Sequence, residues 1–210
     1  MRTAARPLFV ALAAVAAVVA AVLSASPTSS ASLLPGCEHQ TLERPFQSWL
    51  DPLSYVLAPN GGFEEGAAGW TLTGGAKVVS GNESFYVGGP TDSKSLSLPT
   101  GASATTSDVC VGLLDPTVRL FVMNTGSPLS TLKVEVLVTD ASGKTHSSLV
   151  GLVLGGRAWQ PTLPLLYLQN LRALPLLTDG TTSVSFRFTA QGLLGGWRID
   201  DVYVDPFKGV

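Results

Sequence analysis

The stretch Thr117–Asn124, TVRLFVMN, decides the fold that this sequence predicts. Its aliphatic side chains occupy every second position from Val118 to Val122, whereas Arg119 and Phe121 fall between them. A period of two places alternate side chains on opposite faces of a β-strand. The stretch therefore predicts a strand with one buried aliphatic face and one face that carries a cation and an aromatic ring.

The same alternation recurs in Leu132–Thr139 and Ser183–Ala190, where Glu135 and Arg187 lie opposite the apolar face. Short alternating runs fill most of the remaining chain, separated by Gly, Pro, Asn, Asp and Ser, and helical periodicity is almost absent. The pattern predicts an all-β fold, an antiparallel β-sandwich in which the apolar faces of two sheets meet. We expect Arg119, Glu135 and Arg187 to share the outer face of one sheet.

Eight further segments are predicted as strands from the same pattern and from the turn residues between them. They are Ser54–Leu57, Gly69–Leu72, Lys77–Ser80, Ser84–Val87, Ser95–Leu98, Ser107–Val111, Ser147–Val153 and Trp197–Val204. Leu163–Leu177 is the exception, because its leucines and two prolines predict a short helix or an irregular crossing segment.

The beginning of the chain predicts export. Two arginines lie among the first six residues, and an uncharged stretch rich in Ala and Val follows from Pro7 to Leu23. A polar region of small residues then leads to Ala31. This order is typical of a secretory signal peptide, and the apolar stretch is shorter than the roughly 20 residues that span a bilayer. We therefore expect cleavage after Ala31, rather than a retained anchor, and a secreted, extracellular protein.

A lipid anchor on Cys37 is the alternative, since Leu34–Cys37, LPGC, loosely resembles a bacterial lipobox and would make a cell-surface lipoprotein. Pro35 and the long separation from the apolar stretch disfavour it. The mature chain has two cysteines, Cys37 and Cys110, and an even pair in an exported protein predicts a disulfide. Because the closed loop is long, the disulfide would stabilise the fold by about 4 kcal/mol.

The composition of the mature chain limits the number of domains and the classes of partner that we expect. Removing residues 1–31 from the 210-residue chain leaves 179, which suit a tethered segment at 32–59 and one sandwich domain at 60–210. The mature chain has 11 basic and 15 acidic residues, a net charge of −4, and no basic run. We therefore expect no nucleic-acid partner. No later segment is long and apolar enough to span a bilayer, so we also expect no membrane contact after cleavage, and a monomer.

Catalytic motifs are missing from the sequence. His39 and His146 are its two histidines, and neither lies in a nucleophile motif, a zinc motif, a phosphate-binding loop or a dinucleotide fingerprint. Carboxylates occur in pairs, but a glycosidase needs them about 5–9.5 Å apart across a cleft. The sequence therefore predicts a protein that is not an enzyme.

Two motifs at the ends of the predicted domain resemble a known family. Asn60–Glu64, NGGFE, is followed closely by Gly69 and Trp70, and the chain nears its end with Trp197–Val204, WRIDDVYV. Together with Ser93–Leu98, SKSLSL, they resemble the carbohydrate-binding modules of the jelly-roll, galactose-binding-domain-like type. The resemblance extends over about 60–205, and the whole layout also resembles that of secreted actinobacterial proteins.

The resemblance implies a jelly roll in which the first and last strands lie close together and hold a structural Ca²⁺. By motif, Glu64 and Asp200 or Asp201 would supply carboxylates, and Gly62 would supply a carbonyl. Oxygen ligands of this kind suit Ca²⁺. The apolar residues on either side of the Asp pair are oddly spaced, which independently predicts a β-bulge there. The alternative is that the two Asp residues only end a strand.

The resemblance also implies a carbohydrate ligand, with cell-wall polysaccharide as one candidate. Sugar-binding faces combine aromatic rings with polar groups. The predicted ligand-binding residues are Arg119, Phe121, Glu135, Arg187, Trp159 and Tyr86.

The competing interpretation is that the rings belong to the core and that the charges form a solvated face. Two hypotheses follow: a secreted sugar-binding module with a structural calcium, and a secreted structural or protein-interaction sandwich that binds no sugar. Exposed rings would favour the first hypothesis, and buried rings the second.

Overall fold

Thirteen strands and one short 3-10 helix form in the part of the chain that the computed structural model describes, residues 40–112, 117–140, 142–166 and 181–205. The helix η1 is Gln47–Trp49. The strands are β1 (Val56–Leu57), β2 (Trp70–Thr73), β3 (Lys77–Ser80), β4 (Lys94–Pro99), β5 (Ser103–Thr106), β6 (Val109–Gly112), β7 (Thr117–Asn124), β8 (Thr131–Thr139), β9 (Thr145–Val153), β10 (Gln160–Pro161), β11 (Leu165–Leu166), β12 (Thr181–Gln191) and β13 (Gly196–Asp205).

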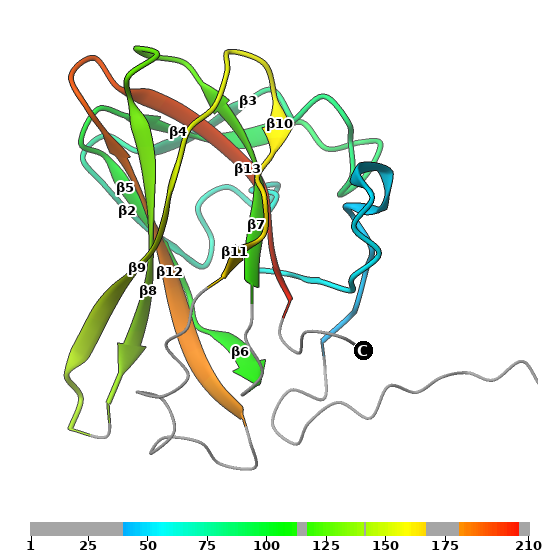
Figure 1. Ribbon diagram of the computed structural model, residues 1–210, viewed down its shortest axis with the longest axis vertical. Coiled ribbons are helices and arrows are strands. Elements are labelled where there is room, and N and C mark those ends of the chain that lie inside the picture. Colours follow the sequence, from blue (N-terminus) through cyan, green and yellow to red (C-terminus); the bar gives the residue numbers. More distant parts are fainter. Residues whose placement is uncertain (1–39, 113–116, 141, 167–180, 206–210) are drawn as a thin grey trace, which may run out of the picture. The chain divides into compact units, whose positions relative to one another are not determined.

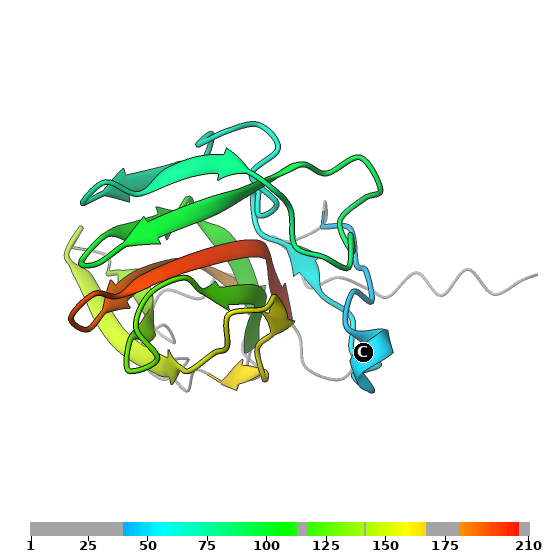
Figure 2. The same ribbon diagram turned by 90° about the horizontal axis from the view of Figure 1, so that it is seen from above.

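The strands form two antiparallel sheets (Figures 1 and 2). The β13 sheet has the order β10-β7-β13-β4-β3, with β1 paired to β13 and β11 to β7. The β12 sheet has the order β2-β5-β12-β8-β9, with β6 paired to β12. The predicted all-β, antiparallel β-sandwich of the jelly-roll type is therefore confirmed.

The main core lies between the two sheets, and alternation in the strands builds it. In β7, Val118, Leu120 and Val122 are fully buried, and in β12 Phe186 and Phe188 face them from the other sheet. Large apolar groups buried in this way supply most of the driving force for folding. The inward faces predicted for these strands are thus the faces that pack.

A second apolar cluster lies on the outer face of the β13 sheet. There Phe46 and Tyr55 pack against Phe121 and Tyr203, and all four side chains are fully buried. Phe46 and Tyr55 belong to residues 40–58, which we call the strap. Its end forms β1 and pairs with β13, so the strap is part of this layer of the fold.

Two β-bulges interrupt the sheets. The register of β13 against β7 shifts between Asp200 and Tyr203, and Asp201 has a φ of 45°. The bulge predicted at the Asp pair is confirmed. A second shift, between Val134 and Glu135 of β8, lies opposite β9.

Several expectations about the elements differ from the structure. The predicted strand Ser84–Val87 is a turn within the loop 81–93, because a buried carboxylate binds its backbone, as described below. Strand β5 was not predicted, since its small residues SATT have almost no apolar contrast.

Other expectations concern parts of the chain outside the described residues. These are the signal at 1–31, the anchor or disulfide residue Cys37, and most of Leu163–Leu177. Among the helices of the described part, none is long and apolar enough to cross a membrane.

Candidate functional site

The outer face of the β13 sheet is largely covered by the strap. Phe121 stacks on Phe46 with ring centroids 5.6 Å apart, and Trp49 meets it edge-on at 5.4 Å. Tyr203 lies 5.7 Å from Phe46 and donates a hydrogen bond to Glu43. The Phe121 ring, which was expected to be available for a ligand, therefore packs against the strap instead.

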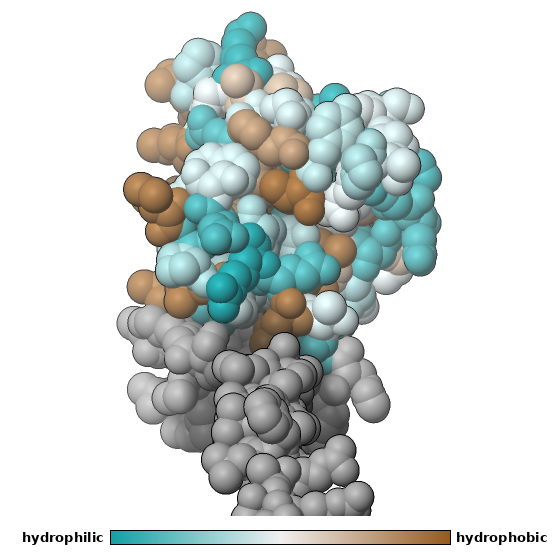
Figure 3. Space-filling view, turned by 90° about the vertical axis from the view of Figure 1, so that its right-hand side faces the viewer, coloured by the Kyte–Doolittle hydropathy of each residue, from teal (hydrophilic) through white to brown (hydrophobic). Residues whose placement is uncertain are grey.

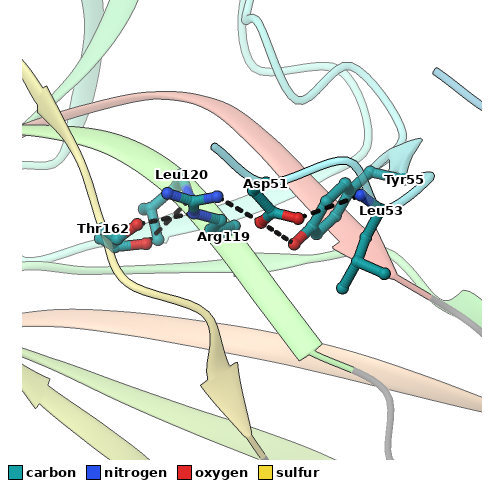
Figure 4. Close-up of polar contacts among 6 residues, drawn as sticks. All are labelled: Asp51, Leu53, Tyr55, Arg119, Leu120 and Thr162. Carbon is teal, nitrogen blue, oxygen red and sulfur yellow. Dashed lines mark hydrogen bonds and ion pairs between the residues drawn. The ribbon is translucent and has the colours of Figure 1, made fainter. Parts of the chain in front are cut away.

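Arg119 is part of the same contact (Figure 4). Its guanidinium forms an ion pair with Asp51 of the strap and lies 4.2 Å from the centroid of the Phe46 ring. Its Nε donates to the carbonyl oxygen of Thr162 at 2.7 Å. The Tyr55 hydroxyl donates to the same Asp51 carboxylate at 2.7 Å. Arg119 and Phe121 are thus buried structural groups, and the expectation that they lie on an open binding face is wrong.

The loop 81–93 covers the next part of this face, and a buried carboxylate holds it. Glu83 is fully buried, and its side chain accepts hydrogen bonds from the backbone N–H groups of Phe85 and Val87. The Glu83 N–H donates in turn to Asp200 of β13 at 2.9 Å. The loop therefore keeps Phe85 and Tyr86 half-exposed, and Tyr86 adopts a φ of 54°.

One level of the outer face stays accessible. Four side chains point outward there, on four neighbouring strands, and we call them the open row: Lys77, Ser97, Arg198 and Met123. The Arg198 guanidinium donates to the carbonyl of Ser80 and lies 5.6 Å from the half-buried ring of Trp159. Figure 3 looks onto the strap side of the molecule and shows a mixed surface, on which brown residues lie among teal and white ones.

The charged residues of the other sheet form a separate face. Glu135 of β8 pairs with Arg187 of β12, with Arg187 Nε 2.9 Å from Glu135 Oε2, and Lys133 Nζ lies 3.0 Å from the same oxygen. Arg119 lies in the β13 sheet, so the expectation that these charges share one face is wrong. The outward positions of β8 and β12 between 131 and 139 and between 183 and 191 contain no aromatic residue.

The bulge in β13 directs its two Asp side chains to different surroundings. The Asp200 carboxylate accepts from the N–H groups of Glu83 and Asp201, at 2.9 and 3.0 Å. Asp201 is also buried, and within the described part of the chain neither of its carboxylate oxygens accepts a hydrogen bond of good geometry. The backbone N–H of Gly88 still interacts with this carboxylate and partly offsets the effect of burial on its pKa. Burial, followed by the negative charges of Glu83 and Asp92, raises the pKa of Asp201 to about 7.

Two glycines let the backbone approach the Asp201 carboxylate closely. A Cβ built on Gly62 would lie 3.0 Å from Asp201 Oδ1, and one built on Gly88 would lie 2.8 Å from the same oxygen. The Gly88 Cβ would also lie 2.6 Å from an Asp92 oxygen. The structure therefore brings Gly62, Gly88, Asp92 and Asp201 close together.

Glu64, the other predicted metal ligand, has different partners. Its carboxylate accepts from the backbone of Ser93 and Lys94 at 2.9 and 2.8 Å, and from the Ser93 hydroxyl at 3.1 Å. Burial would raise its pKa, but these hydrogen bonds outweigh burial and lower it. In residues 40–112, 117–140, 142–166 and 181–205, no group of three His, Cys, Asp or Glu side chains is arranged to hold a metal ion by itself.

Sequence reasoning missed Glu83, Asp92, Asp51 and Arg198 as site residues. Glu83 lies in Asn-Glu-Ser, which resembles a glycosylation sequon, and no motif marks Asp51 or Asp92. Arg198 lies between the buried residues Trp197 and Ile199, so its outward position could have been read from the alternation of β13.

No family model and no curated protein sequence matches the chain. Among solved structures, the fold is similar to the C-terminal family 22 carbohydrate-binding module of Clostridium thermocellum Xyn10B, with a TM-score of 0.47 and 15% identity over 71% of this chain and 94% of that chain. It is also similar to the family 22 xylan-binding domain of Paenibacillus barcinonensis Xyn10C, with a TM-score of 0.45 and 21% identity over 71% and 94%. The bacteriophage CBA120 tailspike protein 4 matches with a TM-score of 0.47 and 18% identity, over 70% of this chain and 21% of that chain. Two of these three structures are carbohydrate-binding modules.

Proposed function

We propose that this chain is a non-catalytic carbohydrate-binding module whose ligand lies on the open row beside Trp159. The observation that carries the proposal is the half-buried Trp159 ring next to outward polar and cationic side chains of three strands. An aromatic ring stacks on the apolar face of a sugar, while polar groups orient its hydroxyls. A polysaccharide chain is the ligand class that suits a row of this kind, since the row crosses four strands.

A glycan array would test this function, with two matched variants. Trp159→Ala removes the ring of the proposed site, and Arg187→Ala truncates a charged group on the other sheet. We expect Trp159→Ala to weaken binding about tenfold, the loss of roughly 1.4 kcal/mol of stacking, and Arg187→Ala to leave binding unchanged. A chain that binds no glycan on the array would contradict the function. Loss of binding only in Arg187→Ala would contradict its location.

We propose in addition that a structural Ca²⁺ binds at Asp201. The buried Asp201 carboxylate, which accepts no hydrogen bond of good geometry, supports a cation there, as do the nearby Asp92 carboxylate and the close approach of the Gly62 and Gly88 backbone. Asp201 and Asp92 would supply carboxylate oxygens, and backbone carbonyls such as that of Gly62 would complete a shell of roughly six to eight oxygens. The ion would neutralise the negative charges that meet at the bulge.

Thermal unfolding with and without a chelator tests the calcium proposal separately from the sugar. We expect chelator to lower the melting temperature of the native chain, and to have no effect on Asp201→Asn. Asp140→Asn, which changes a half-exposed carboxylate in the β8–β9 turn, is the control and should respond like the native chain. A native melting temperature that does not change in chelator would contradict calcium binding.

One observation favours the second function, a structural or protein-interaction sandwich that binds no sugar. The four rings of the strap cluster are fully buried, so this part of the sheet presents no platform to a ligand. The array decides between the two functions, because only the first requires a retained glycan.

We also propose that the protein is secreted and that Cys37 and Cys110 form a disulfide. The order of charged, apolar and small residues at 1–31 supports export. Gln40 Nε2 donates to the carbonyl oxygen of Cys110 at 2.9 Å, so the start of the described chain, three residues after Cys37, lies against β6. N-terminal sequencing of the exported chain tests cleavage after Ala31.

A further inference from the structure

Three leucines are almost fully exposed on two neighbouring turns at one end of the sandwich. Leu129, in the turn between β7 and β8, is 89% exposed, and Leu193 and Leu194, between β12 and β13, are 87% and 75% exposed. The two turns lie side by side at the upper left of Figure 1. We call these three residues the leucine tip. Single exposed leucines are common on protein surfaces, but three that project together at one place mark an interaction site.

Close packing of the backbone fixes the leucine tip. A Cβ on Gly126 would lie 2.4 Å from the carbonyl oxygen of Leu194, so any other residue there would push the turns apart. The Ser127 N–H donates to the same oxygen at 2.8 Å. Leu194 has a φ of 55°, a conformation that glycine adopts at much lower cost. The exposed Leu194 side chain therefore gains little packing within the chain.

The polar groups of the two turns are largely satisfied within the protein. Asn124, which is buried, accepts from the Gly126 N–H at 2.9 Å and donates to the Ser127 carbonyl at 3.0 Å. The Thr100 hydroxyl donates to the carbonyl of Gly195 at 2.5 Å. Backbone groups that are already paired can enter an apolar medium without the cost of unpaired donors and acceptors.

The charges around the leucine tip have one sign. Five connections lie at this end of the sandwich, 74–76, 100–102, 125–130, 154–159 and 192–195, and none of them contains Asp or Glu. Arg157 in one of them and Lys77 directly after another are both exposed. An apolar tip with a basic rim complements a bilayer with anionic headgroups.

From these observations we propose that the leucine tip inserts into the surface of an anionic lipid bilayer. A protein partner or a second copy would need a continuous apolar surface of matching shape, whereas the leucine tip consists of side chains on separate turns. A lipid surface deforms around each side chain and needs no matching shape. Insertion would place the domain on a membrane surface without any membrane-spanning segment, and this replaces the expectation that the mature chain makes no membrane contact.

Co-sedimentation with vesicles tests the proposal on the purified chain. We expect binding to vesicles rich in phosphatidylglycerol and weaker binding to vesicles of phosphatidylcholine alone. The double variant Leu193→Ser/Leu194→Ser should bind at least about tenfold more weakly, and Leu129→Ser should also lose affinity. Arg157→Ala should weaken binding to the anionic vesicles about fivefold.

Leu50→Ser is the matched control, because Leu50 is 95% exposed with a φ of 60° but lies on the strap. It should bind vesicles like the native chain, and all variants should keep the native melting temperature. Equal binding by the double variant and the native chain would overturn the proposal, as would no binding to either vesicle. A native dimer that the double variant converts to a monomer in sedimentation equilibrium would overturn it in favour of a second copy.

Discussion

Asp200 and Asp201 are adjacent in sequence, but their carboxylates have different surroundings because the backbone changes direction at Asp201. The positive φ of Asp201 turns its carboxylate away from the position that strand alternation would give it. Asp200 therefore binds the loop 81–93, and Asp201 faces Gly62 and Gly88. Through these two residues, β13 contacts two loops that come from distant parts of the chain.

Glu83 is the residue on which the loop 81–93 depends. Glu83→Ala would remove the acceptor of two backbone N–H groups. It would also expose to water the hydrogen bond that the backbone N–H of residue 83 donates to Asp200. We expect the free energy of unfolding to fall by about 2 kcal/mol. Urea denaturation measures it, with the exposed neighbour Ser84→Ala as a control that should change little. A loss no larger than that of the control would show that the carboxylate does not hold the loop.

Glu135 should give the protein an acid-dependent component of stability. Burial would raise the pKa of this carboxyl, but the hydrogen bonds and charges of Arg187 and Lys133 outweigh burial and lower it from 4.5. A lowered pKa in the folded state stabilises the fold above the unfolded pKa, and this contribution disappears as the pH falls through the folded value.

We therefore expect the native chain to be more stable than Glu135→Gln by about 1 kcal/mol at neutral pH, and the difference to shrink as the pH falls below the ordinary pKa of 4.5 and through the lowered folded value. Urea denaturation of both proteins across this range measures the difference. A difference that stays constant with pH would contradict the role of the charge.

Among the elements, the strap has the largest effect on which part of the outer face of the β13 sheet stays accessible. Its rings fill the outer face of the β13 sheet at the level of Phe121 and Tyr203, and the loop 81–93 covers the adjoining level. Among the described residues of this face, the open row is the part that these two segments leave uncovered. The sequence indicated that residues before Asn60 lie outside the resembling module, but not where they pack, because that depends on contacts with strands far along the chain.

The ion pair of Asp51 and Arg119 should fasten the strap. Asp51→Ala would leave the Arg119 guanidinium buried without its carboxylate partner. Breaking a buried ion pair is costly, so we expect a loss of about 3 kcal/mol in the free energy of unfolding. Denaturation measures the loss, and limited proteolysis should cut the variant within 40–58 first. Glu65→Ala, which removes an exposed carboxylate, should neither lower the free energy of unfolding nor promote cleavage within 40–58. If the protease cut Asp51→Ala first at another place, the role of the ion pair in fastening the strap would be contradicted.

At the scale of the whole molecule, alternation predicted which side of each long strand is buried, because that pattern lies within a few residues. It did not predict which sheet each strand joins, since pairing depends on partners far away in sequence. Arg119 and Glu135 were therefore assigned to one face although their strands belong to different sheets. The resemblance predicted that Gly62 and Asp201 are ligands of one metal site. Asp92 lies near Asp201 because of the course of the loop 81–93, which no motif in the sequence indicates.

The predicted disulfide would join the beginning of the mature chain to β6. We expect reduction to lower the melting temperature, and Cys110→Ser to lower the free energy of unfolding by about 4 kcal/mol or somewhat less. Mass spectrometry after alkylation checks the bond, since both cysteines should react only after reduction. Alkylation of the unreduced native chain would contradict the disulfide.

The bulge in the β8–β9 pair has a consequence for many copies of this protein in solution. Strand β9 is the last strand of its sheet among those described, and its outer edge could extend the sheet of a neighbouring molecule. The register shift between Val134 and Glu135 twists β9. A twisted edge strand is poorly suited to form the regular row of hydrogen bonds that pairing with another strand requires. We infer that this irregularity helps the domain to stay dispersed when it is concentrated.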